Sequence, residues 1–136
     1  MNAVDTNVLV YSRDPRDPRK QAAANALLTS LPDCVLLWQV ACEYLAASRK
    51  LQQFGYDLSQ AMADLSDMRA AWRTTIPSWT VVDVAESLLK KYSLSFWDAL
   101  LVAACLEAGV TRLYTEDFSD SLRAEGLEVV NPFAAP

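Results

Sequence analysis

The residues best suited to chemistry in this sequence are four acids that lie far apart along the chain. They are Asp5, Glu43, Asp98 and Asp117. Two carboxylates about 4 Å apart repel each other by roughly 4 kcal/mol at an effective dielectric constant of about 20, and protonation or a divalent cation relieves that cost. Carboxylate oxygens select hard ions such as Mg²⁺ or Mn²⁺. Such an ion binds a phosphodiester, lowers the pKa of a bound water and stabilises an in-line displacement.

Each acid taken singly also has a simpler explanation. Asp5 suits the cap of a following helix, and Ser95-Phe-Trp-Asp98 has the spacing of a capping box. Asp117 lies in a polar loop, where an Asp commonly stabilises a turn. Glu43 is the lone charge in the apolar run 40–47, so a solvated helix face explains it less well. These explanations leave open why all of them fall at one edge of the sheet predicted below.

The composition excludes several kinds of catalytic site. The chain has 136 residues and no histidine. Serine–histidine–aspartate and cysteine–histidine catalysis, and histidine-ligated zinc, are therefore ruled out. Chemistry has to use carboxylates with a hard metal, or Lys, Tyr or Ser. The net charge of −5 argues against a broad nucleic-acid-binding surface but leaves room for a local one.

The sequence predicts a cytoplasmic protein that does not span a membrane. Its longest uninterrupted apolar run, 99–106, is too short to cross a bilayer. The N-terminus has no basic segment, and Asp5 interrupts the place where a signal core would lie. The cysteines are Cys34, Cys42 and Cys105; without metal-like spacing they are expected to be buried thiols in a reducing compartment.

The elements that would position the acids follow from hydrophobic periodicity and capping signals. Strands are predicted at 1–4, 35–37, 110–115 and 127–130, with a weak one at 79–82. Helices are predicted at 6–12, 18–31, 39–53, from 57 onward, at 83–92 and at 96–108. Alternation of this kind predicts one domain with a parallel sheet and helices on both faces. Sites in such sheets form beyond the carboxyl ends of the strands, where the acids fall.

The helix predicted after residue 57 carries an apolar stripe. Its members are Leu58, Met62, Leu65, Met68 and Trp72. Core packing explains such a stripe, and a groove that accepts a helix or strand of a partner protein is the functional alternative.

Several motifs, taken together, resemble the PIN domain, and in particular the VapC-type toxin ribonucleases of type II toxin–antitoxin systems. Beside Glu43, they are Val4-Asp-Thr-Asn-Val-Leu9, Phe96-Trp-Asp-Ala-Leu-Leu101, Leu113-Tyr-Thr-Glu-Asp117 and Val129-Val-Asn-Pro-Phe133. Their order and spacing cover nearly the whole chain. The resemblance implies a single PIN domain over residues 1–136, with a three-layer α/β/α fold around a central parallel sheet.

The resemblance also implies an activity and partners. It implies a Mg²⁺- or Mn²⁺-dependent endoribonuclease, held in check by a cognate antitoxin and commonly a homodimer. The acids named first correspond to the family's catalytic, metal-binding quartet. Asn7 and Thr115 match its supporting polar residues, Asn7 to orient Asp5 and Thr115 to bond a carboxylate or a metal-bound water. Glu116 is an alternative or addition to Asp117. A basic cluster is expected to guide the RNA backbone: Arg13, Arg16, Arg19 and Lys20.

Other classes of protein fit parts of the pattern. A phosphoaspartate receiver or a haloacid-dehalogenase-type phosphatase also places an Asp after the first strand, but both need a second nearby acid and a late Lys, and no Lys follows Lys91. A PIN-type nuclease acting in RNA processing or on DNA uses the same site. A non-catalytic interaction module is the remaining alternative.

Overall fold

Strands and helices alternate along the chain in the computed structural model, which describes residues 1–118 and 122–134. The strands are β1 (Asn2–Val4), β2 (Val35–Leu37), β3 (Arg73–Thr75), β4 (Arg112–Tyr114) and β5 (Glu128–Val130). The α-helices are α1 (Thr6–Tyr11), α2 (Pro18–Ser30), α3 (Trp38–Ala47), α4 (Leu58–Ala71), α5 (Thr80–Lys91) and α6 (Phe96–Glu107). Two 3₁₀ helices, η1 (Ser48–Phe54) and η2 (Arg123–Glu125), complete the described elements.

The strands form a parallel sheet, as the sequence predicts. β4 lies between β1 and β5, with Leu113 opposite both Ala3 and Val129. β2 pairs with β3 in a second parallel ladder. A single parallel bridge between Asn2 and Cys34 joins the two ladders. Because every one of these pairings is parallel, the carboxyl ends of the strands share one edge of the molecule.

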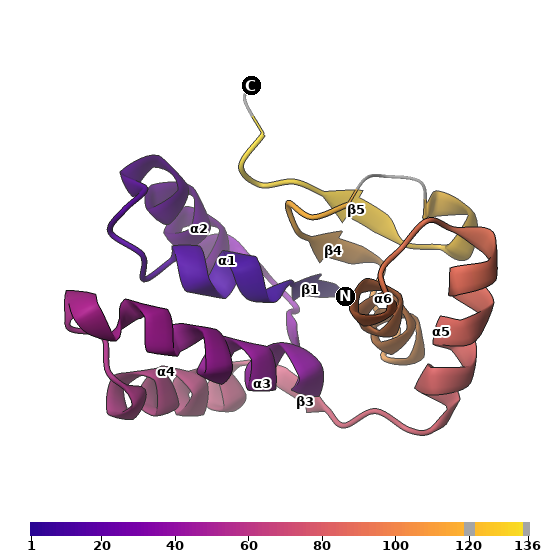
Figure 1. The fold of residues 1–136 in the computed structure, drawn as a ribbon, viewed down its shortest axis with the longest axis horizontal. Helices are drawn as coiled ribbons and strands as arrows, with labels where there is room; N and C mark the ends of the chain where they lie inside the picture. The colour runs from indigo at the N-terminus through magenta and orange to yellow at the C-terminus, as the bar shows by residue number, and fades with distance from the viewer. Residues whose placement is uncertain (119–121, 135–136) are drawn as a thin grey trace.

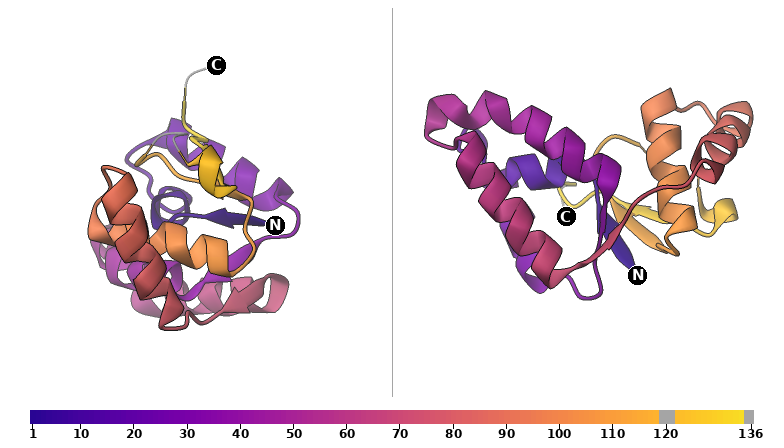
Figure 2. Two further views of the ribbon diagram at one scale, coloured as in Figure 1. Left: turned by 90° about the vertical axis from the view of Figure 1, so that its right-hand side faces the viewer. Right: turned by 90° about the horizontal axis from the view of Figure 1, so that it is seen from below.

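Helices cover both faces of the sheet in a three-layer α/β/α arrangement. Figures 1 and 2 show α1 to α4 grouped on one side and α5 packed against α6 on the other. The helix predicted at 96–108 is α6, and its buried residues are Ala99, Leu101, Val102, Ala103, Ala104 and Cys105. Its first turn is different, since the side chains of Phe96 and Trp97 are exposed. Among the described residues, no helix is long and apolar enough to cross a membrane.

Local signals set the ends of the helices that lead to the acids. The Ser95 hydroxyl accepts a hydrogen bond from the Asp98 amide and so caps α6. Gly109, with φ of 77°, follows the end of α6 and turns the chain toward β4. A larger residue at Gly109 is disfavoured by this positive φ, whereas the nearby Met1 methyl, 3.1 Å from where a Cβ would lie, is the flexible end of a side chain. The capping box of Asp57 and Gln60 is present at the start of α4.

Three expectations from the sequence are wrong. The weak strand at 79–82 belongs instead to α5, and the strand of this region is β3. The β-branched Val81 and Val82 suggested a strand, yet the buried face of α5 follows helical spacing. The helix predicted over 39–53 is α-helical only to Ala47 and continues as η1. Cys42 is exposed, because it lies on the outer face of α3, while the other cysteines are buried.

The apolar stripe of α4 is divided between core and surface. Leu65 is buried, and Met68 and Trp72 pack against the core. Leu58 and Met62, nearer the start of the helix, are 60% and 49% exposed. Core packing therefore explains only part of the stripe.

Candidate active site

Asp5 lies directly after β1 and is both a helix cap and a buried acid. Its Oδ1 accepts a hydrogen bond from the Thr6 amide at 2.7 Å, and its Oδ2 accepts one from the Thr115 hydroxyl at 2.8 Å. Burial raises the pKa of Asp5 to about 6, although the two hydrogen bonds oppose the shift. The negative charges of Asp117 and Glu43 also raise it. A buried acid with this pKa, facing other acids, is typical of a functional site.

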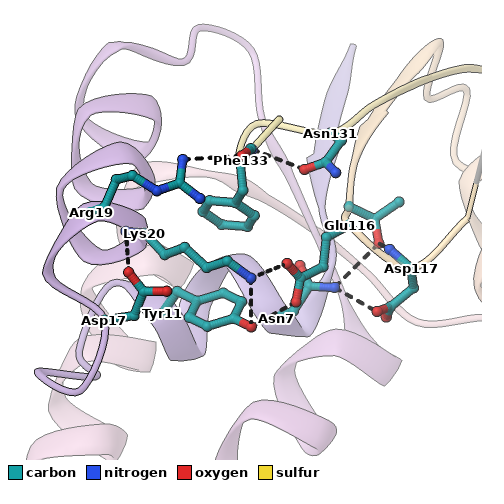
Figure 3. A network of polar contacts seen from close by, with 10 residues as sticks. Asn7, Tyr11, Asp17, Arg19, Lys20, Glu116, Asp117, Asn131 and Phe133 are labelled. Atoms are coloured by element: carbon teal, nitrogen blue, oxygen red, sulfur yellow. Dashed lines mark hydrogen bonds and ion pairs between the residues drawn. The ribbon is translucent and has the colours of Figure 1, made fainter. Parts of the chain in front are cut away.

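Thr115, directly after β4, connects Asp5 to Asp117. While donating to Asp5, its hydroxyl accepts from the side-chain amide of Asn7 at 3.3 Å and from the Asp117 backbone amide at 3.1 Å. Asn7 also donates to Asp117 Oδ2 at 3.1 Å (Figure 3). The expected contact of Thr115 with a carboxylate is confirmed. The expected direct contact of Asn7 with Asp5 is not found: Asn7 holds Asp117 and reaches Asp5 through Thr115.

Glu43 lies on α3, just beyond the end of β2, and is held by two side chains. It accepts hydrogen bonds from the Thr6 hydroxyl at 3.1 Å and from Gln39 Nε2 at 2.7 Å. Gln39 Nε2 also donates to the backbone carbonyl of Trp97 at 3.2 Å. Glu43 is thus tied to the start of α1 and, through Gln39, to the start of α6. Gln39 was not among the predicted site residues, although its position four residues before Glu43 on a predicted helix is a signal for such a contact.

Asp98 lies in the first turn of α6 and belongs to the same group. Burial raises its pKa, a hydrogen bond with Ser95 opposes the shift, and the charges of Asp117 and Glu43 raise it further. Asp5 and Asp98 are both within range of the charges of Glu43 and Asp117. Hydrogen bonds support the same arrangement, because they link Asp5 to Asp117 through Thr115, and Glu43 to Thr6 and, through Gln39, to the first turn of α6. The structure therefore brings together the acids that the sequence places at one edge of the sheet.

Glu116 belongs to a different network. Its carboxylate accepts from Lys20 Nζ at 2.7 Å and from the Tyr11 hydroxyl at 2.7 Å, and Lys20 Nζ also contacts the Tyr11 hydroxyl at 3.2 Å (Figure 3). Burial alone would raise the pKa of Glu116, but these hydrogen bonds outweigh it and hold the pKa below its usual value. Of the neighbouring acids, Asp117 is the one whose carboxylate turns toward Asn7 and the acid cluster.

The basic cluster is engaged within the chain. Its contacts are Arg13 with Asp64 at 2.8 Å, Arg16 with Asp14 at 2.8 Å, Lys20 with Glu116 at 2.7 Å, and Arg19 with the Phe133 carbonyl at 3.3 Å. These contacts fix the loop before α2 and the segment after β5. The predicted role of the cluster in guiding RNA gains no support from them.

A comparison with protein families decides the class of this chain. The family model described as "PIN domain" matches residues 3–121. The chain belongs to the PIN domain family. The matched range includes Asp5, Glu43, Asp98 and Asp117. No match was found among curated proteins.

Solved structures share the fold of this PIN domain. VapC20 of Mycobacterium tuberculosis, a toxin that cleaves the sarcin–ricin loop, is 20% identical, with 93% of this chain and 96% of VapC20 aligned at a TM-score of 0.67. A chain of a toxin–antitoxin complex from Klebsiella pneumoniae is 19% identical, with 97% of this chain and 98% of that chain aligned at a TM-score of 0.67. VapBC-1 of nontypeable Haemophilus influenzae is 16% identical, with 98% of this chain and 98% of that chain aligned at a TM-score of 0.64.

The donor atoms of this PIN domain suit a hard divalent cation. They are carboxylate oxygens, and the Asn7 Oδ1 atom nearby is buried without a hydrogen-bond partner. Within residues 1–118 and 122–134, no three acidic or cysteine side chains are close enough to hold an ion as they stand. The charge and the donor atoms of the site thus fit a metal ion, but the carboxylates lie too far apart to form a closed coordination shell. Mutually repelling carboxylates, each held by neutral donors, are expected to stay apart until a cation draws them together.

Proposed function

We propose that this PIN domain is a metal-dependent endoribonuclease and the toxin of a toxin–antitoxin pair. The observation that carries the proposal is the convergence of Asp5, Glu43, Asp98 and Asp117, which come from four separate parts of the sequence. The pKa values of Asp5 and Asp98 are raised by burial and by the other acids, so a divalent cation would stabilise the cluster in its ionised form.

The four acids would hold one or more Mg²⁺ or Mn²⁺ ions. A bound ion supplies Lewis-acid stabilisation of a phosphodiester and lowers the pKa of a coordinated water. Asp5 is held by the Thr115 hydroxyl and the Thr6 amide, so its carboxylate cannot turn away from the cluster. Asn7 positions Asp117 from the other side. In-line attack by water predicts products with a 5′-phosphate and a 3′-hydroxyl.

The activity is tested by cleavage of RNA by the purified chain with Mg²⁺ and with EDTA. Asp98→Asn is expected to abolish cleavage while circular dichroism and the melting temperature show a folded protein. Asp67→Asn is the matched control, since Asp67 is an exposed acid of α4, which supplies none of the four acids, and its loss should leave the rate unchanged. Full activity of folded Asp98→Asn would overturn the assignment, and equal loss in Asp67→Asn would point to a general charge effect.

The role as a toxin is supported by the kind of protein that shares the fold. Structures of toxin–antitoxin complexes align over nearly the whole chain. An antitoxin is therefore the expected partner, with RNA as the substrate and a homodimer as the expected assembly. The exposed part of the α4 stripe, Leu58 and Met62, is the surface offered to an antitoxin segment.

Expression in a bacterial host tests the toxin role separately from the chemistry. The chain is expected to arrest growth, and the Asp5→Ala variant is expected not to. Cleavage in vitro without growth arrest would favour a PIN-type nuclease of RNA processing. Absence of both cleavage and Mg²⁺ binding would favour a non-catalytic interaction module.

A further inference from the structure

Two exposed tryptophans lie beside the acid cluster, and the proposed chemistry does not use them. Trp38 is the first residue of α3 and is 54% exposed, and Trp97 is in the first turn of α6 and is 64% exposed. A single exposed aromatic side chain is common on protein surfaces, but two that lie together beside an acid cluster mark a candidate binding surface. Both begin helices at the edge of the sheet where the acids converge.

Both indoles line the same open cavity. Its volume is about 440 Å³, and its lining is Trp38, Gln39, Cys42, Glu43 and Trp97. Glu43 is a member of the acid cluster, so the cavity borders the candidate active site on the Glu43 side. A base next to a phosphate bound at the acids can reach this cavity past Glu43.

The cavity is held in shape by contacts between α3 and α6. Gln39 Nε2 donates both to Glu43 and to the backbone carbonyl of Trp97. These two acceptors identify the nitrogen of the Gln39 amide, and its oxygen is left buried without a partner. The Trp97 ring is also supported by an edge contact with Phe96, at 5.2 Å between ring centroids. Trp97 is thus fixed relative to Glu43 while its indole face remains open.

We propose that Trp38 and Trp97 form a stacking site for a nucleobase next to the phosphate that is cut, so that these two residues position the substrate for the proposed reaction. The proposal rests on the proposed nuclease function. Indole faces stack on any base, whereas the bases of a duplex already stack on each other. The two indoles would therefore hold whichever accessible base lies beside the bound phosphate, without reading its identity.

The test measures binding of a fluorescein-labelled, non-self-complementary single-stranded hexaribonucleotide by anisotropy. The Asp5→Asn background is used to prevent cleavage. Trp38→Ala and Trp97→Ala are each expected to weaken binding by about 5- to 100-fold, the effect of losing one stacked base. Trp38→Phe and Trp97→Phe should restore most of the affinity. Trp79→Ala is the matched control, because Trp79 is 86% exposed and does not line the cavity.

A second arm identifies the base. Binding is measured for a series of hexamers that each lack one base at a different position. Trp97→Ala should weaken binding to every hexamer except the one that lacks the base stacked on Trp97. The same sequence as a duplex should bind equally to Trp97→Ala and to the parent. Unchanged single-strand affinity in both alanine variants, or an equal loss in Trp79→Ala, would overturn the proposal.

The remaining outcomes separate this inference from its alternatives. If Trp38→Ala or Trp97→Ala lowers the mass found by sedimentation equilibrium and leaves RNA affinity unchanged, the surface is a protein interface and the stacking site is wrong. Wild-type protein is assayed in parallel for Mg²⁺-dependent cleavage. If the tryptophans are needed for RNA binding but the wild-type protein does not cleave RNA, the proposed nuclease function is wrong and the stacking site stands. If the protein cleaves RNA but binding does not depend on the tryptophans, the nuclease function stands and the stacking site is wrong.

Discussion

The Thr115 hydroxyl donates to Asp5 at 2.8 Å from a position with no exposed surface. A hydroxyl has one proton, so its other contacts, with Asn7 and with the Asp117 amide, must be ones in which it accepts. The direction of every bond in this group is therefore fixed by Asp5 being an acceptor. One side chain thereby links the strand-end acid of β1 to the loop that carries Asp117.

Replacing Thr115 by Val keeps the shape of the side chain and removes the hydroxyl. The pKa of Asp5 is expected to rise further, because a hydrogen bond that lowers it is lost. The change should destabilise the protein by about 1 to 3 kcal/mol, since buried polar groups lose a partner. Urea unfolding and a ¹³C NMR titration of the Asp5 carboxyl measure the two effects. Thr115→Ser keeps the hydroxyl and serves as the control; a similar Asp5 titration in Val and Ser variants would contradict the bond's role.

The raised pKa of Asp5 predicts how the metal-free protein responds to pH. Between the ordinary value of 3.8 and about 6, the folded state binds a proton that the unfolded state does not. Stability therefore rises as pH falls through 6, and the contribution from pH 7.5 to 5 is about 1 to 1.5 kcal/mol. Asp98, whose pKa is also raised, adds in the same direction.

Unfolding by urea in EDTA, at several pH values, measures this slope. Asp5→Asn should remove Asp5's share of it, whereas the surface variant Asp67→Asn should keep the full wild-type slope. An Asp5→Asn protein with an unchanged slope would show that another group binds the proton.

The sequence was sufficient to predict the part of the site that depends on strand ends. Asp5 and Asp117 each follow a short apolar run, and parallel pairing brings such ends together whatever the details of the loops. The choice between Glu116 and Asp117 was not predictable. Adjacent residues after a strand point in different directions, and the partner that claims Glu116 is Lys20, 96 positions away. Propensity also failed at 79–82, where buried helical packing outweighed two β-branched residues.

Lys20 and Glu116 are expected to stabilise the loop that carries Asp117 without taking part in chemistry. Their side chains are each 23% exposed, so this ion pair is expected to stabilise the folded protein more than a fully exposed pair does, by about 1 kcal/mol. A double-mutant cycle of Lys20→Met and Glu116→Gln measures this coupling. The pKa of Glu116 is lowered in the folded state, so the coupling is present above its unfolded pKa and is lost as pH falls through the folded one.

The same variants separate the two neighbouring acids. Glu116→Gln should lower the rate of RNA cleavage by no more than a few-fold, while Asp117→Asn should abolish cleavage with little loss of stability. The opposite pattern would make Glu116 the fourth acid of the site.

Divalent cations should stabilise the folded protein through the four acids. An ion that binds only the folded state adds about 2.7 kcal/mol at 100 times its dissociation constant, which for a domain of this size raises Tm by roughly 10 °C. Removal of the ion by EDTA should reverse the shift. Asp98→Asn and Asp5→Asn should lose most of it, because each removes a charge from the cluster, and Asp67→Asn should retain it. NaCl at matched ionic strength should not reproduce the shift, because screening acts weakly on partly buried charges. A shift of equal size in Asp98→Asn would place the cation elsewhere on the molecule and would remove the acids from the proposed metal site.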